Sequence, residues 1–369
     1  MKYIKLKDVC KINMGQSPDS SSYNESGEGI PFFQGNADFG DRYPVIRIWC
    51  SEPKKVAQEN DILISVRAPI GAINYSKEKC CIGRGLAALT VDKTKISEKL
   101  LFWVLKAKKE ELNRQGTGST FKAISKKSLE ELLIPQIDIK EQEKDVEILE
   151  KIYMIIQNKH KELKLLTDLI SARFVEMFGD PIRNTQNRPT TKLINVVKMQ
   201  RGFDLPVQDR NQDGNIPVYG ANGVLDSHNT ARIHGGGVIT GRSGTIGKVF
   251  YTEGDYWPLN TSLFSVDKHG NNVIYLAYLL QMFDLTRFVE GTGVPTLNRN
   301  MFHNRQIIDV PINEQNQFAA FVQQVNKSKF VIHKFLYCFI DNKQSIIKPR
   351  LNTKESGKIR GGKPHADEF

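Results

Sequence analysis

The sequence predicts an α+β fold in which two related α/β domains are each followed by a long helix. One observation is an internal repeat, because short sequence blocks of the first half of the chain recur in the same order in the second half. The other is that each copy ends in a stretch whose apolar residues recur every seven positions. With 369 residues, the chain is long enough for two domains that each bury a core.

The repeat consists of seven matched blocks separated by loops of different length and content. Chance similarity of glycine-rich turns is the alternative, which seven blocks in one order disfavour. Buried strands are expected over 61–66 and 238–240, where apolar runs are bounded by turn residues. The alignment places Arg67 opposite Arg242, and we infer that one unit was duplicated and its loops diverged. The matched pairs are 5–11 with 192–198, Gly15 and Pro18 with Gly202 and Pro206, 30–35 with 216–220, 64–72 with 239–248, 91–93 with 266–268, 116–118 with 291–293, and 133–135 with 309–311.

Each unit ends in a predicted long helix. Pro135 and Pro311 are both followed by a Glu-Gln pair and then by apolar residues spaced alternately three and four apart, which is typical of a coiled coil. A helix over 141–178 would be about 57 Å long, too long for a domain of about 130 residues to cover. The alternative is a surface helix that packs on its own domain. The interleaved series starts at Val146 in the first helix and at Phe321 in the second. The predicted partner-helix seam consists of Leu149, Ile156, Leu163, Ile170, Phe318, Val325, Ile332 and Phe339.

Domain boundaries follow from these patterns. Gly179 and Pro181 are expected to end the first helix, because a glycine and then a proline are typical of a helix C-terminus. We expect a first domain at 1–136, a long helix at 137–180, a second domain at 181–311, a second helix at 312–347 that pairs with the first, and a disordered tail at 348–369.

The net charge favours a polyanionic partner. Of the net charge of +11, residues 348–369 contribute only +3, so the body is basic in its own right, as in many proteins that bind nucleic acid. No apolar run reaches the roughly 18 residues of a membrane span, and the N-terminal residues lack the apolar stretch of a signal peptide. We therefore expect a cytoplasmic protein with no membrane partner. The five cysteines form no Cys-x-x-Cys pair, which favours reduced structural thiols.

Motifs of catalysis are incomplete. The run 241–248 has five residues between its outer glycines and a valine after its lysine, whereas a P-loop needs four residues and then Ser or Thr. His234 opens a Gly-Gly-Gly run without any Gly-x-Ser-x-Gly nucleophile motif in the chain. Asp19, Glu52 and Lys54 match nuclease carboxylates only loosely and have no counterpart in the second unit. The sequence contains no Pro-Pro pair, so it lacks the Asn/Asp-Pro-Pro-Tyr/Phe motif of DNA amino-methyltransferases. We therefore expect no catalytic and no metal-binding residue.

The combination of the internal repeat with the two long helices resembles the specificity subunit of type I restriction-modification systems over about residues 1–347. The motifs that carry the resemblance are the glycine-rich run 241–247, Gly-Thr-Gly at 291–293 and Met-Phe-Gly-Asp-Pro at 177–181, together with the long helices near Pro-x-x-Glu-Gln. These framework turns are specific as a set. The first unit departs from the pattern, because Arg67-Ala-Pro-Ile-Gly71 replaces the fuller glycine-rich form.

The resemblance implies two target-recognition domains that each read half of a bipartite double-stranded DNA site, joined by two long antiparallel coiled-coil helices in a pseudo-twofold arrangement. It implies a non-catalytic subunit without a cofactor of its own. The helices would dock two methylation subunits, which carry S-adenosylmethionine and flip the target adenine. Restriction (translocase) subunits would add ATP-driven and magnesium-dependent cleavage. The alternatives are a combined restriction-methylation enzyme, which a methylation assay on the lone chain would reveal, and a scaffold that binds no DNA, which a salt-dependent DNA shift assay would reveal.

Loops and strand edges with amide, hydroxyl and cationic side chains are the expected reading elements, since these groups pair with base edges. For each residue the alternative is a solvated or turn-stabilising role. The candidate DNA-binding residues are Gln16, Ser17, Gln34, Asn36, Arg67, Arg84, Ser119 and Lys122 in the first unit, and Arg201, Tyr219, Asn222, Arg242, Ser243, Asn260, Thr292 and Asn298 in the second.

Overall fold

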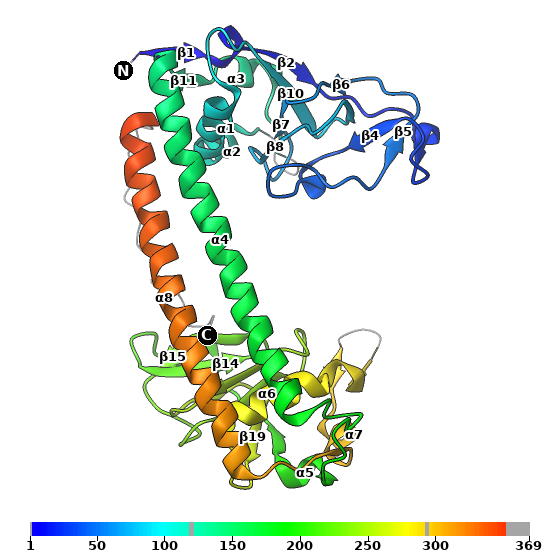
Figure 1. Cartoon of the computed structure of the whole chain (residues 1–369), viewed down its shortest axis with the longest axis vertical. Coiled ribbons are helices and arrows are strands. Elements are labelled where there is room, and N and C mark those ends of the chain that lie inside the picture. Colours follow the sequence, from blue (N-terminus) through cyan, green and yellow to red (C-terminus); the bar gives the residue numbers. More distant parts are fainter. Residues whose placement is uncertain (1, 118–121, 292–294, 352–369) are drawn as a thin grey trace. The chain divides into compact units, whose positions relative to one another are not determined.

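The computed structural model describes residues 2–117, 122–291 and 295–351, with side chains up to Cys338. These residues form two compact units, one made of 2–157 with 337–351 and the other of 158–336. Each unit combines sheets with short helices and includes part of two long helices (Figure 1). The predicted α+β fold of two related α/β domains with long helices is confirmed. In the described part of the chain, no helix is both long and apolar enough to cross a membrane.

The first unit is built on two sheets that share an apolar layer. A four-stranded antiparallel sheet has the order β2 (Cys10–Met14), β10 (Leu86–Val91), β7 (Ile62–Ser65), β8 (Ile73–Tyr75). A five-stranded sheet has the order β3 (Tyr23–Asn24), β5 (Trp49–Cys50), β4 (Ile30–Phe33), β9 (Cys80–Ile82), β6 (Val56–Ala57). The remaining elements are the pair β1 (Tyr3–Lys5) and β11 (Leu133–Pro135), the helices α1 (Glu98–Ala107), α2 (Lys109–Gln115) and α3 (Lys126–Glu130), and the 3-10 turns Leu6–Asp8, Ser20–Ser22 and Asn36–Asp38.

Strand β7 shows why the apolar run at 61–66 forms a buried strand. Successive side chains of a strand point to opposite faces of its sheet. Ile62 and Ile64 therefore pack in the cluster that contains Trp103 of α1, whereas Leu63 packs against residues of the five-stranded sheet such as Phe33. Both faces are covered, so the strand is apolar throughout.

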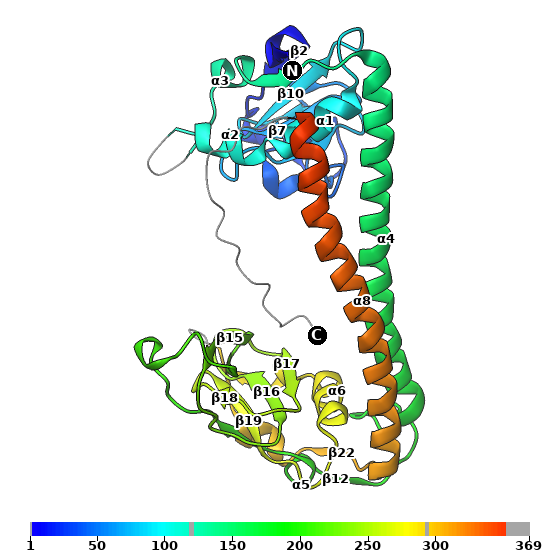
Figure 2. The same ribbon diagram turned by 90° about the vertical axis from the view of Figure 1, so that its left-hand side faces the viewer.

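The second unit repeats the strand order of the four-stranded sheet and has a smaller second sheet. Its four-stranded antiparallel sheet has the order β13 (Lys198–Arg201), β19 (Ser262–Asp267), β16 (Gly237–Gly241), β17 (Val249–Thr252). A three-stranded sheet has the order β15 (Gly223–His228), β14 (Ile216–Gly220), β18 (Trp257–Pro258). The other elements are the pairs β12 (Thr190–Lys192) with β22 (Gln306–Ile308) and β20 (Val289–Glu290) with β21 (Thr296–Leu297), the helices α5 (Leu193–Val196), α6 (Val273–Phe283) and α7 (Arg299–His303), and the 3-10 turns Val207–Asp209 and Leu285–Phe288. Figure 2 shows α6 between this sheet and the long helices.

The long helices are α4 (Ile139–Phe178) and α8 (Ile312–Leu351), so α8 continues four residues beyond the expected position 347. The rest of the expected tail, 352–369, lies outside the described residues. In the second unit the two helices are antiparallel, because the C-terminal turns of α4 contact the N-terminal turns of α8. The rings of Phe174 and Phe178 lie 5.4 and 5.6 Å from that of Phe318. Both α4 rings also contact Tyr275 of α6, so this end of the seam packs on its own domain as well.

The residues of the main seam series differ in their burial. Leu149, Ile170, Phe318, Val325 and Ile332 are buried, and Ile156 and Leu163 are half-buried. The side chain of Phe339 lies outside the described part.

The interleaved series predicted for α8 is wrong. That series included Phe321, Ser328 and Phe335, but Phe335 is 38% exposed whereas Leu336 is 6% exposed and Val322 is fully buried. The buried series therefore lies one residue later. At two turns of α8, both the predicted position and the next one are apolar (Phe321 with Val322, and Phe335 with Leu336). The sequence pattern therefore did not determine which face of the helix is buried. The contact with α4 and α6 selects that face.

A buried glutamine joins each long helix to its domain. In the first unit, Gln142 is 2% exposed, accepts from the backbone nitrogen of Ser97 at 2.7 Å and donates to the carbonyl of Ile137 at 2.8 Å. In the second, Gln315 accepts from the nitrogen of Asn272 at 2.9 Å and donates to Val310 at 2.8 Å. The Glu-Gln pair of each repeat thus has a structural role, because its glutamine satisfies backbone groups where the domain helix begins.

Candidate nucleic-acid interface

In the first unit, five of the predicted DNA-binding residues line one pocket of about 180 Å³. The loops that follow β2, β4, β7 and β9 form it. No residue of its lining is acidic, and its polar groups are amides, hydroxyls and two guanidiniums. The lining consists of Ser17, Gln34, Gly35, Asn36, Ser65, Arg67, Ala68, Arg84 and Gly85.

A close backbone approach brings these loops together. A Cβ on Gly15 would lie 2.1 Å from the carbonyl oxygen of Gly83, so only glycine fits there. The second unit has the same contact, since a Cβ on Gly202 would lie 2.3 Å from the oxygen of Leu259. The first matched glycine pair of the repeat therefore maintains the loop convergence in both units.

The hydrogen-bond register shows which positions of the two units are equivalent. In the first unit, Ser65 pairs with Leu86 in the sheet, and two residues later Arg67 forms a bridge with Ala123. In the second unit, Gly241 pairs with Ser262, and two residues later Ser243 forms a bridge with Thr296. Arg67 therefore corresponds to Ser243. Arg242 corresponds to Val66, so the sequence alignment of Arg67 with Arg242 is wrong by one residue. The sequence alignment was based on identical residues, whereas the backbone hydrogen bonds between the strands determine which positions are equivalent.

Outside the pocket, the first-unit candidates lie on neighbouring loops. Gln16 is exposed, and its backbone nitrogen bonds the carbonyl of Ile82 at 3.0 Å. Lys122 is exposed, and its carbonyl accepts from Ala68 at 3.1 Å, beside Arg67. Ser119 lies outside the described residues.

The second-unit candidates also meet through backbone bonds. Those between Leu259 and Tyr219 (2.8 Å) and between Arg242 and Thr261 (2.8 Å) connect three of the loops. Arg201 and Asn222 are exposed, the latter beside Lys248, and Arg242 and Ser243 are half-buried. Thr292 lies outside the described residues.

Three second-unit candidates have partners of their own. Tyr219 is only 8% exposed and packs edge-on against Tyr256 in a small core, so it supports the loops from beneath. Asn298 caps α7 by accepting from the nitrogen of Asn300 at 3.1 Å. The amide nitrogen of Asn260 donates to Asp204.

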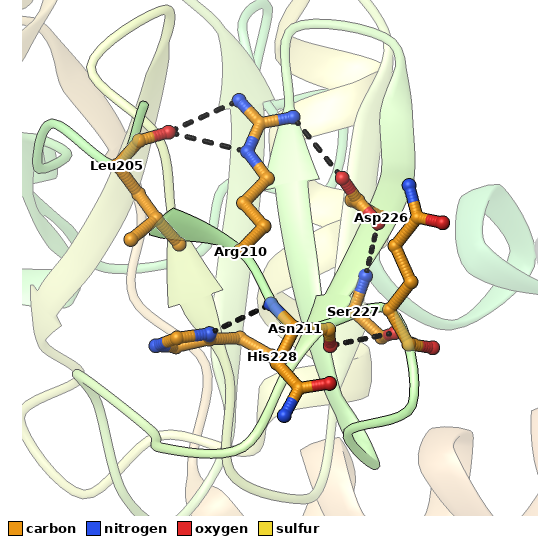
Figure 3. Close-up of polar contacts among 7 residues, drawn as sticks. Leu205, Arg210, Asn211, Asp226, Ser227 and His228 are labelled. Carbon is orange, nitrogen blue, oxygen red and sulfur yellow. Dashed lines mark hydrogen bonds and ion pairs between the residues drawn. The ribbon is translucent and has the colours of Figure 1, made fainter. Parts of the chain in front are cut away.

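A further loop of the second unit was missed by sequence reasoning. It joins β13 to β14, and Arg210 holds it in place (Figure 3). The guanidinium donates to the carbonyl of Leu205 at 3.1 and 3.2 Å and pairs with Asp226 at 3.3 Å, with both charged side chains about nine-tenths buried. The nitrogen of Asn211 donates to Nδ1 of His228 at 3.2 Å. The sequence carries no signal for this arrangement, because the ion pair joins positions 16 residues apart outside any motif.

The described residues offer no metal centre, and two of the buried thiols are kept protonated. No group of three or more His, Cys, Asp or Glu side chains among them has the geometry of a metal site. Burial raises the pKa of the Cys80 thiol to about 11 and that of Cys10 to about 12, which keeps both thiols protonated at neutral pH.

Comparison with known proteins identifies the family. The family model described as type I restriction modification DNA specificity domain matches residues 1–167 and 189–348. The chain belongs to this family. A 152-residue segment is 47% identical to the putative type I restriction enzyme MjaX specificity subunit of Methanocaldococcus jannaschii and covers 41% of this chain but only 36% of that relative.

Two solved structures are also similar. The HsdS subunit from Thermoanaerobacter tengcongensis is 46% identical over 42% of this chain and 37% of that chain, with a TM-score of 0.38. The type I restriction-modification S subunit from M. genitalium has a TM-score of 0.61 over 96% of both chains at 15% identity, which supports the fold alone.

Proposed function

We propose that this chain is the sequence-specific DNA-binding specificity subunit of a type I restriction-modification complex. The observation that carries the proposal is the repeated site: in a chain of this family, each unit brings the same four loops together around polar side chains. Residues 1–136 and 181–311 would be the target-recognition domains, each reading one half of a bipartite site. Two related but non-identical readers on one chain suit an asymmetric, split site.

The chemistry of the loops supports base reading. Amides and guanidiniums on a rigid backbone pair with base edges in the major groove, while the general positive charge attracts the phosphate backbone. Of the predicted set, Arg67, Arg84, Gln34 and Asn36 in the first unit have the most favourable placement, since all four line one pocket.

The long helices would dock the partner subunits. Helix α4 leaves Met154 54% and Leu165 57% exposed, and α8 leaves Val331 65% exposed, so both long helices offer apolar side chains that a partner could cover. Two methylation subunits would bind there, and restriction (translocase) subunits would complete the complex in the cytoplasm. S-adenosylmethionine, ATP and magnesium would belong to these partners, so the chain alone would neither methylate nor cleave DNA.

Exchange of one domain tests the proposal. Residues 1–135 are replaced by the equivalent domain of a relative, and methylation is mapped with the partner subunits supplied. One half of the methylated motif should change while the other half stays, because each unit reads independently. The unmodified chain serves as the control. A change in both halves would contradict independent reading, and methyl transfer by the lone chain would contradict the non-catalytic role.

A further inference from the structure

We propose that Arg84, with Arg67 beside it, reads guanine in the first half-site, and that Asn260 is the corresponding reader in the second half-site. The inference rests on the proposed function and deepens it, because it names the residues and the bases that distinguish the two halves.

The backbone around Arg84 is fixed from several sides. Its own nitrogen donates to Oγ of Ser17 at 3.4 Å. The flanking glycines are tied to neighbouring loops: Gly83 donates to Phe33 at 2.8 Å, and the nitrogen of Val66 donates to the carbonyl of Gly85 at 2.9 Å. The backbone of Arg84 is therefore held in a defined place at the pocket, which gives a base-reading side chain a fixed point of attachment.

The two guanidiniums of the pocket are exposed, and neither has a side-chain partner among the described residues. Within the described part of the chain, neither Arg67 nor Arg84 forms a side-chain hydrogen bond or an ion pair, and the nearby carboxylate of Asp38 already binds Arg47 at 2.5 Å. Each guanidinium is therefore open to an acceptor on a bound molecule, which would replace water. Guanine offers O6 and N7 side by side in the major groove, which matches the fork of an arginine.

A phosphate contact is the competing explanation, and the repeat argues against it. Phosphate contacts position a protein without reading sequence, so equivalent positions of two duplicated units should keep the same cation. Here Arg67 of the first unit corresponds to Ser243 of the second, and Arg84 corresponds to Asn260. The backbone hydrogen bonds around these positions are nevertheless the same in both units. Variation on a constant framework is what a reading position requires.

Asn260 is prepared for a different base. Its amide nitrogen donates to Asp204, the counterpart of Ser17, because a carboxylate can only accept. The amide oxygen remains to accept a hydrogen bond, and the second N–H of the amide remains to donate one. In the major groove, the groups that donate are the amino groups of adenine and cytosine. Position 260 should therefore select an amino-bearing base where position 84 selects guanine.

The decisive variant is Arg84→Lys, tested in the complete complex with partner subunits by methylation mapping and by DNA binding at several salt concentrations. Lysine keeps the charge and loses the bidentate fork. We expect the preference for guanine to fall roughly 10- to 100-fold at one position of the first half-site. The second half-site serves as an internal control. Lys127→Asn, an exposed change outside the pocket, should leave the motif unaltered.

A reciprocal exchange adds a gain of function. In the double variant Asp204→Ser with Asn260→Arg, the second unit receives the first unit's pair, and one position of the second half-site should change to guanine. An unchanged motif in both folded variants, or an equal loss of affinity for all DNAs, would overturn the inference. Failure of the unmodified complex to methylate a bipartite site would instead contradict the proposed function.

Discussion

At the scale of single residues, His303 is a buried side chain with one defined protonation state. It is 6% exposed, and its Nε2 accepts from the backbone nitrogen of Met199 at 3.0 Å, so this nitrogen must be unprotonated. Burial lowers the pKa of His303 below 6.5, and the positive charges of Arg299 and Lys198 lower it further. The neutral imidazole therefore joins α7 to β13.

We expect the second unit to lose stability as the pH falls below about 6.5. The unfolded chain then takes up a proton that the folded state resists, so the free energy of unfolding decreases until the folded pKa is passed. The contribution is fully present above pH 6.5. Thermal unfolding between pH 7.5 and 5.5 measures it.

The matched variant is His303→Gln, whose amide oxygen accepts from Met199 without titrating. Its melting temperature should decline less over the same range. Identical pH profiles of the two proteins would show that His303 does not carry the effect.

At the scale of elements, the two buried glutamines explain how 40-residue helices are attached to small domains. Gln142 and Gln315 occupy the same place in their units, each satisfying the first free nitrogen of a domain helix. In the first unit, a second set of contacts attaches the domain to α4. There, Arg42 binds both oxygens of Glu150 at 2.6 and 2.7 Å and lies 4.4 Å from the ring of Tyr153.

Gln315→Leu should lower the free energy of unfolding by about 1–3 kcal/mol. The leucine keeps the volume but removes the partner of the buried carbonyl of Val310 and of the partly buried nitrogen of Asn272. Urea unfolding should show an earlier midpoint with an unchanged slope. Gln317→Leu, an exposed change on the same helix, is the control and should stay within about 0.5 kcal/mol. Equal midpoints for the two variants would contradict the role of Gln315.

At the scale of the whole molecule, the duplication is the main feature. Helix α4 is the segment of chain that leads from the first unit into the second. We therefore expect the length of α4 to influence the number of base pairs between the two half-sites.

Four residues inserted after Leu163 should widen the gap between the methylated half-sites by roughly one to two base pairs. The helix gains about 6 Å, against about 3.4 Å for each base pair. Four residues approximate one helical turn and keep the apolar seam nearly in phase, whereas a three-residue insertion overwinds it and serves as the comparison. Methylation mapping with the partner subunits is the measurement. An unchanged gap in an active variant would mean that the helices dock partners without measuring DNA.

The repeat, the two long helices and the polar chemistry of the loops could be predicted from the amino-acid sequence alone. These features are patterns of neighbouring positions: matched blocks in one order, apolar residues every seven positions, and glycines beside amides and arginines. The five predicted residues that line the first-unit pocket were found in this way.

The details that depend on contacts between distant segments could not be predicted and became visible in the folded chain. The ladder bonds made Arg67 equivalent to Ser243, the packing of α8 buried Leu336 in place of Phe335, and the core took up Tyr219. The ion pair of Arg210, which fixes an unpredicted loop, belongs to the same class. A local pattern states which side chains are available. Which of them is buried, paired or left free is determined by partners that the chain meets only when it folds.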